Sequence, residues 1–231
     1  MANPPENQRI HAVLTGDIIA SSEMPAETLA QVRAVLQGAA EGFCNSWSEP
    51  VEARLDIYRG DAWQLLLTEH NLALRLALYL RAQLRARLEA DTRISIAIGT
   101  CERVDSEKVS LSTGEAFTLS GRALDAMTGY FDMTAALPVR AGETGLWAKA
   151  SVSLVSELVR SWTRRQSEIA GLALLHPEET HEEISRRLVP PVTKQSVTAS
   201  LSGAGWRALQ EPLTAFETTQ WKSLLAAQAT V

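Results

Sequence analysis

Two aspartates stand where the sequence could place a metal site. Asp17 ends the apolar run of VLTGDIIASS, and Asp61 lies in YRGDAWQLLL, where one apolar run turns back into the next. Each residue alone is typical of a structural role, a helix cap for Asp17 and a turn for Asp61. Side by side, however, two carboxylates repel each other unless a cation binds between them, and Mg²⁺ or Mn²⁺ accepts such oxygen ligands. The metal interpretation therefore depends on whether the fold brings the two residues together.

The hydrophobic pattern predicts the order β-α-β-β-α-β, followed by a further helix and strand. A proline at the first turn, at Pro25, opens the first helix, and the hairpin turns at Arg59-Gly60-Asp61. The expected elements are a strand at 11–19, a helix at 25–43, a hairpin at 52–68, a helix at 70–90, a strand at 92–100, a helix at 114–127 and a strand at 130–137. In such a split β-α-β fold, the first strand lies beside the third and antiparallel to it. This order makes Asp17 and Asp61 neighbours and favours the metal interpretation.

The helix expected at 70–90 has leucines four residues apart, from Leu72 to Leu88, which predicts a stripe facing the core. We expect its arginines to form a solvated face on the opposite side. These are Arg75, Arg81, Arg85 and Arg87. Because they interrupt the longest apolar stretch, this segment is not expected to cross a membrane.

Composition narrows the function classes. The chain has 231 residues, of which 45% are hydrophobic, and a net charge of −5, so two domains are expected and general binding to nucleic acid or anionic membrane is not. The start, MANPPENQRI, has no signal-peptide pattern, and Cys44 and Cys101 are the only cysteines. We expect a cytoplasmic protein with free thiols.

Residues 179–206 have the pattern of a helix-turn-helix. Thr180 and Glu183 predict a capping box for a first helix, prolines follow it, and Thr193 predicts the cap of a second helix that ends near Gly203. The second helix of such a motif enters the DNA major groove by its amino-terminal part. The residues expected to contact double-stranded DNA are Arg186, Arg187, Thr193, Lys194, Gln195, Ser196, Thr198 and Ser200. The alternative is a three-helix module that binds a protein or is purely structural.

A closing amphipathic helix is expected from residue 211, and it could support dimerisation.

The predicted fold class is therefore α+β, a ferredoxin-like antiparallel sheet with helices, joined to a small all-α domain. The expected divisions are a sheet domain at 1–142, a helical connector at 143–162 and a helix-turn-helix domain with a C-terminal helix at 163–231.

LTGDIIASS, YRGDAWQLLL and GEAFTLSGRALDAM resemble the signature regions of nucleotide cyclase and GGDEF-type palm domains, and more specifically the SatD-like family of bacterial proteins. The resemblance covers about residues 10–140 and, with the helix-turn-helix, extends to about 210. It implies a metal site of Asp17, Asp61 and the backbone carbonyl of Ile18, with Mg²⁺ or Mn²⁺. It also implies a head-to-tail homodimer. The residues that the resemblance assigns to nucleotide binding are Ile18, Gly60, Thr118 and Arg122, and Gly114, Phe117 and Ser120 fall at the other positions of the cyclase helix motif.

The sequence departs from the cyclase pattern at the substrate positions. Thr118 stands where cyclases have Asn, Ile57 stands where they have a purine-reading Lys, and Ala62 follows the hairpin where GGDEF enzymes have a second acid. A retained metal pair beside an altered substrate site favours a sensor. The main hypothesis is a DNA-binding transcriptional regulator whose palm domain senses a purine nucleotide or a nucleotide second messenger. Two alternatives stay open: an active metal-dependent cyclase or nucleotidyl transferase, with Arg122 as the candidate catalytic residue, and a palm domain that only dimerises the DNA reader.

Overall fold

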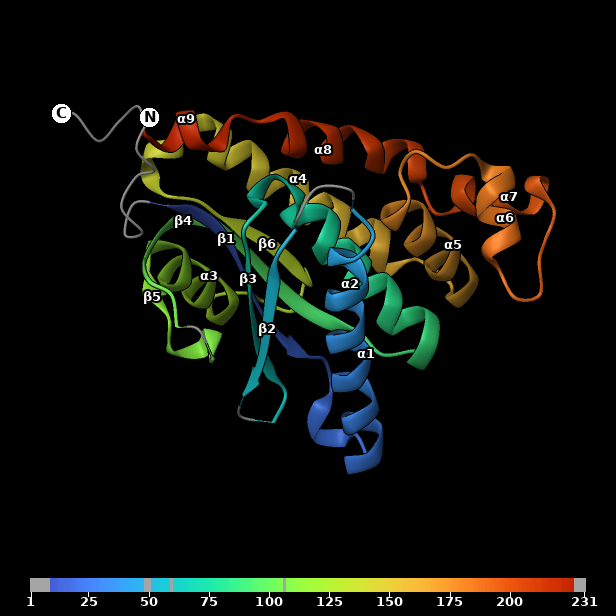
Figure 1. Cartoon of the computed structure of the whole chain (residues 1–231), viewed down its shortest axis with the longest axis horizontal. Helices are drawn as coiled ribbons and strands as arrows, with labels where there is room; N and C mark the ends of the chain where they lie inside the picture. The colour runs from blue at the N-terminus through green and yellow to red at the C-terminus, as the bar shows by residue number, and fades with distance from the viewer. Residues whose placement is uncertain (1–8, 48–50, 59, 106, 227–231) are drawn as a thin grey trace.

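The chain folds as an α+β protein in which one sheet is packed between helices (Figure 1). The structure is a computed structural model, and it describes residues 9–47, 51–58, 60–105 and 107–226. Arg59 of the predicted turn and residues 227–231 of the predicted closing helix lie outside these residues.

The sheet has the strand order β2-β3-β1-β4, with β5 and β6 both pairing with β4. The strands are β1 (Ile10–Ile18), β2 (Ala53–Tyr58), β3 (Ala62–Leu67), β4 (Thr92–Arg103), β5 (Thr113–Gly114) and β6 (Met133–Ala136). β1 is antiparallel to both β3 and β4, whereas β6 is parallel to β4. The predicted β-α-β-β-α-β order and the neighbouring of the first and third strands are confirmed. The two-residue β5 was not predicted.

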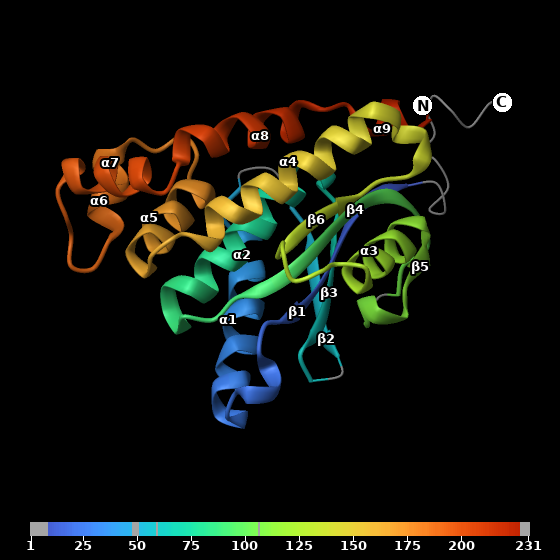
Figure 2. The same cartoon turned by 180° about the vertical axis from the view of Figure 1, so that it is seen from behind.

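Nine helices of the α type accompany these strands within the described ranges. They are α1 (Ala26–Cys44), α2 (Ala73–Leu88), α3 (Glu115–Asp125), α4 (Gly142–Arg160), α5 (Arg164–Leu175), α6 (His181–Arg187), α7 (Lys194–Gly203), α8 (Trp206–Thr218) and α9 (Trp221–Ala226). α1 and α2 cover one face of the sheet and α3 covers the other, as the two opposite views show (Figures 1 and 2).

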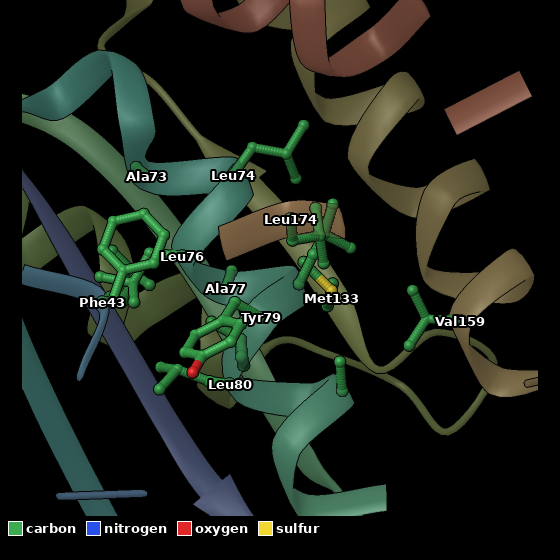
Figure 3. Packing of buried hydrophobic residues seen from close by; sticks show 14 of the residues in the cluster. Phe43, Ala73, Leu74, Leu76, Ala77, Tyr79, Leu80, Met133, Val159 and Leu174 are labelled. Atoms are coloured by element: carbon green, nitrogen blue, oxygen red, sulfur yellow. The ribbon is translucent and has the colours of Figure 1, made fainter. Parts of the chain in front are cut away.

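α2 is the centre of the main core. Leu76 and Leu80 are fully buried, and residues of α1, β6, α4 and α5 surround the helix (Figure 3). The expectation that its arginines form a solvated face is wrong for Arg75 and Arg81, which are 8% and 0% exposed. The reason is tertiary: α4, α5 and α8 lie over the side of α2 that faces away from the sheet.

Arg81 is the centre of a buried charge network that joins the sheet region to the helices. Its guanidinium donates to Asp91 at 2.8 and 2.6 Å and to Asp132 at 3.1 Å, and it also reaches Ser156 of α4. Arg85 pairs with Asp91 at 2.8 Å, and Arg160 pairs with Asp132 at 3.0 Å. Buried charges need such partners because desolvation disfavours them.

The network makes stability depend on pH through Asp132. Burial acts to raise the pKa of this carboxyl, but the hydrogen bonds and charges of Arg160 and Arg81 outweigh it and hold the pKa below its ordinary value. A carboxyl with a lowered pKa in the folded state stabilises the fold above its unfolded pKa of about 3.9, and this stabilisation is lost as the pH falls through the folded pKa. We expect Asp132→Asn to destabilise the protein near neutral pH and progressively less as the pH falls below about 4.

Urea unfolding at a series of pH values measures this difference. Asp125→Asn, at an exposed position that ends α3, is the control and should change little at any pH. A destabilisation by Asp132→Asn that stays constant down to pH values where the protein unfolds in acid would contradict the linkage.

The face of the sheet under α3 carries a polar row. Asp56, Gln64, Thr15 and Ser95 are successive cross-strand partners on β2, β3, β1 and β4, and Thr134 of β6 continues the row. Gln64 donates to Thr15 Oγ1 at 3.2 Å, and Thr15 in turn contacts Ser120 of α3 at 2.7 Å between hydroxyl oxygens. A small second cluster, which includes Val13 and Phe117, packs beside the row.

The helices after β6 pack back onto the sheet region, and one hydrophobic cluster runs from Ala12 to Leu225. The closing helix differs from the prediction. α8 begins at Trp206, the helix ends before Thr219, and a second helix, α9, begins at Trp221. α8 returns along α4, and Glu217 forms an ion pair with Arg75 of α2 at 2.5 Å. The aromatic residues Phe216 and Trp221, which could have supported dimerisation, are buried within their own chain.

The cysteines and the length of the helices complete the description of the fold. Neither cysteine forms a disulfide, and burial raises the pKa of the Cys101 thiol to about 12. No described helix combines the length and the apolar character needed to cross a membrane.

Candidate functional site

The backbone brings Asp17 and Asp61 side by side at one end of the sheet. Asp17, the next-to-last residue of β1, lies opposite Ala62 of β3, the residue that follows Asp61. The amide N–H of Ile18 donates to the carbonyl of Asp61 at 3.2 Å. Gly60 forms the hairpin turn with φ of +90°, in the region that favours glycine.

The two carboxylates nevertheless have different partners. Arg93 lies directly across from Asp17 in the β1–β4 register, and its Nε donates to Asp17 Oδ1 at 2.8 Å while Nη2 contacts Oδ2. This hydrogen bond raises the pKa of Arg93. Asp61 instead accepts a hydrogen bond from the hydroxyl of Ser21, in the segment that leads to α1.

The sequence analysis missed two arginines at this end of the sheet. The position of Arg93 opposite Asp17 depends on the antiparallel register of β1 and β4, which the sequence alone does not give. Arg33 of α1 lies near the hairpin: a Cβ built on Gly60 would be 3.7 Å from its Nη2. The Nε of Arg33 is buried without a hydrogen-bond partner among the described residues. The site thus combines Asp17 and Asp61 with the guanidinium group of Arg93, and Arg33 lies beside the hairpin turn at Gly60.

The chemistry of this set suits a bound phosphate with a metal ion better than a metal ion alone. Within the described part of the chain, no group of three or more His, Cys, Asp or Glu side chains could hold a metal. Asp17, Asp61 and the carbonyl of Ile18 could supply three oxygen ligands, and phosphate oxygens and water would complete the shell of Mg²⁺ or Mn²⁺. Metal binding to Asp17 competes with its ion pair to Arg93, and a phosphate gives that guanidinium a new partner.

The expected nucleotide-binding helix is α3. Gly114 precedes it with φ of +145°, and a Cβ there would lie 2.7 Å from the carbonyl oxygen of Thr100, so only glycine fits. Phe117 and Ser120 are buried against the sheet, where they support the helix. Thr118 and Arg122 are exposed on the outer side of α3, away from the polar row, so within one chain they do not face the aspartates.

The helix-turn-helix pattern corresponds to α6 and α7, which pack on α5. Both capping predictions are confirmed: Thr180 and Glu183 form a capping box, and the hydroxyl of Thr193 accepts from the N–H of Ser196 at 3.2 Å. Val197 and Leu201 of α7 are buried, as predicted. The remaining amino-terminal side chains of α7 point to solvent; the exposed ones are Lys194, Gln195, Ser196 and Thr198, and Ser200 is half-buried.

The charges of this segment are balanced. Residues 163–206 contain five arginines and lysines and five glutamates. The two arginines of α6 are already paired, Arg186 with Glu182 at 2.9 Å and Arg187 with Glu179 through several close contacts. The hydrogen bond with Arg187 lowers the pKa of Glu179. Arg186 and Arg187 must leave these exposed ion pairs to contact a phosphate, and Lys194 has no ion-pair partner among the described residues.

Comparison with protein-family models and with the sequences of curated proteins gives no match.

Proposed function

We propose that this protein is a DNA-binding regulator whose sheet region binds a nucleotide together with Mg²⁺ or Mn²⁺. The observation that carries the proposal is that α7 is exposed to solvent at one end of the molecule. Its amino-terminal end is exposed and polar, and α6 and α7 lie at the end of the molecule farthest from α3 (Figures 1 and 2). A helix presented in this way can enter a major groove without a clash from the sheet.

Two features of the sheet region support the nucleotide half of the proposal. Its strand order, β2-β3-β1-β4 in an antiparallel sheet, is consistent with a cyclase-like palm. The adjoining ends of β1 and β3 place Asp17 and Asp61 beside Arg33 and Arg93, so that anionic and cationic groups meet at one edge. Nucleotide phosphates with a divalent ion match such a mixture of charges.

Because the charges of residues 163–206 are balanced, we expect specific DNA binding to need two copies of the protein. Each neutralised phosphate contributes roughly 0.9 to the slope of log K against log salt, and one module offers Lys194 and two paired arginines. A twofold dimer, paired through the palm domains, would present two α7 helices to half-sites about 34 Å apart. The expected target is an inverted repeat. Selection from random duplexes tests the proposal, and a strict monomer in light scattering that enriches no sequence would leave α5 to α7 as a protein-binding module.

The metal prediction concerns thermal stability. We expect Mn²⁺ with a nucleoside triphosphate to stabilise the fold by about 2.7 kcal/mol when the ligand is at a hundred times its dissociation constant. Asp61→Ala should abolish the shift in melting temperature because it removes a metal ligand. Glu211→Ala, at an exposed carboxylate on α8, is the control and should retain the shift.

The outcome that would refute the metal site is a full shift in the double variant Asp17→Ala with Asp61→Ala. Mass spectrometry of the recovered nucleotide separates a sensor from an enzyme, since a sensor returns the nucleotide unchanged.

The phosphate prediction concerns Lys194. We expect Lys194→Ala to weaken binding by a similar factor for all DNA sequences and to lower the salt slope by roughly one unit for each Lys194 in the complex. Titrations at several salt concentrations measure both effects. Lys222→Ala on α9, far from α7, should leave the slope unchanged; an equal loss in both variants would mean that the effect is one of overall charge.

A further inference from the structure

A cleft of about 660 Å³ opens at the free edge of the sheet, beyond Arg93 of the Asp17 and Asp61 site, whose Nη1 donates to the carbonyl of the lining residue Met127 at 3.4 Å. β6 pairs with β4 on one side only, and it lies between α4 and α3 (Figure 2). The cleft is bounded by the C-terminal end of α3, by β6 and by the first turns of α4. A volume of this size is typical of pockets for small molecules.

The walls of the cleft are mainly apolar. The apolar lining includes Met127, Phe131, Leu137, Val139 and Leu146. Val139 is 99% exposed and Leu146 is 71% exposed, although water contact with such side chains is unfavourable. An apolar ligand body would remove this surface from water.

The polar groups of the cleft are those that recognise an anion. Lys149 is the one charged residue among those that line it, and it forms no ion pair with another described residue. It lies on the same side of α4 as Gly142 and Gly145, and helix side chains lean toward the N-terminus, so its ammonium reaches toward the first turn. No described side chain caps that turn, and although the N–H of Gly142 already donates to the carbonyl of Val139, the positive end of the helix dipole favours negative charge there.

Two further groups inside the cleft lack partners. Thr134 is only 8% exposed, lines the cleft, and makes no side-chain hydrogen bond with another described residue. The N–H of Ile94 donates to the carbonyl of Asp132 at 2.8 Å, so every second residue from Asp132 bonds to β4. Ala135 therefore turns its backbone N–H and C=O away from β4, and it too lines the cleft. The hydroxyl of Thr134 and the backbone groups of Ala135 can therefore donate to and accept from a ligand in the cleft.

We propose that this cleft binds a small amphipathic anion, a molecule with an apolar body and a single carboxylate. The carboxylate lies between Lys149 and the first turn of α4, the apolar body covers Met127 and Leu146, and Thr134 donates to the ligand. The proposal does not depend on DNA binding or on the metal site.

Methionine-methyl NMR with naphthalene-2-acetate as the probe tests it. The chain has four methionines, of which Met127 lines the cleft and Met24 lies near α1. We expect a saturable shift of the Met127 signal without a shift of Met24, and about tenfold weaker binding of naphthalene-2-acetamide, which lacks the charge. Inorganic phosphate alone should not reproduce the shift.

Matched variants locate the site. Lys149→Met should remove the preference for the acid over the amide, whereas Lys222→Met should keep it. Ser153→Trp, within the lining, should abolish binding, whereas Ala150→Trp, exposed on the same helix outside the lining, should not. No saturable Met127 shift up to about 10 mM probe, or equal binding of acid and amide by the unaltered protein, would overturn the proposal.

Discussion

Replacing Arg81 by Met is expected to lower the free energy of unfolding by about 3 kcal/mol. The guanidinium is 0% exposed and binds Asp91, Asp132 and Ser156 at once. Its removal leaves the buried Asp132 and the partly buried Asp91 with fewer partners, and breaking a buried ion pair by removing one member typically costs about 3–5 kcal/mol. The lower end applies because Arg85 and Arg160 remain to pair with the two carboxylates.

Urea or thermal unfolding measures this destabilisation, which corresponds to a fall of roughly 6–12 °C in melting temperature for a chain of this size. Arg87→Met is the matched control, since Arg87 is exposed on the same helix and should change stability by less than about 0.5 kcal/mol. If both variants were equally stable, Arg81 would be dispensable and the network would not join the sheet region to α4.

Replacing Gln195 and Thr198 by Ala is expected to relax the DNA sequence preference by about 1–3 kcal/mol for each base that α7 no longer reads. Both side chains are exposed on the amino-terminal half of α7. Gln can pair with adenine through two hydrogen bonds, and the methyl and hydroxyl groups of Thr reach base edges or phosphates. Thr198 is also held by the ring of His181 at 2.8 Å, so its orientation is fixed before DNA binds.

Selection from random duplexes, run with the native protein and with each variant, measures the change. Ser202→Ala is the control, at an exposed position near the C-terminal end of α7 where base contact is not expected. Native-like sequence preference in the double variant would show that α7 does not read bases, even if the protein still binds DNA.

Local sequence determined most of the elements and the caps of α6 and α7, but not β5 or the start of α8. Leucines at helical spacing predicted α2, and the alternation around Ile94 predicted β4. The caps at Thr180 and Thr193 were correct because a cap depends on hydrogen bonds between residues that lie within three positions of each other. The β1–β3 pairing followed from the element order, because few topologies connect these elements without crossings.

Tertiary packing alone decided which charged side chains are buried. Arg81 and Arg87 each adjoin a leucine of the predicted stripe, yet Arg81 is buried against α4 and Arg87 is exposed. Tertiary structure also decides which charged side chains pair. Asp17 pairs with Arg93, 76 residues away, because the strand register places them opposite each other. Periodicity identifies the apolar side of an element, but burial of its polar side depends on elements that come later in the chain. For this reason the sequence could place Asp17 and Asp61 beside each other, while only the folded chain assigned their carboxylates to Arg93 and Ser21.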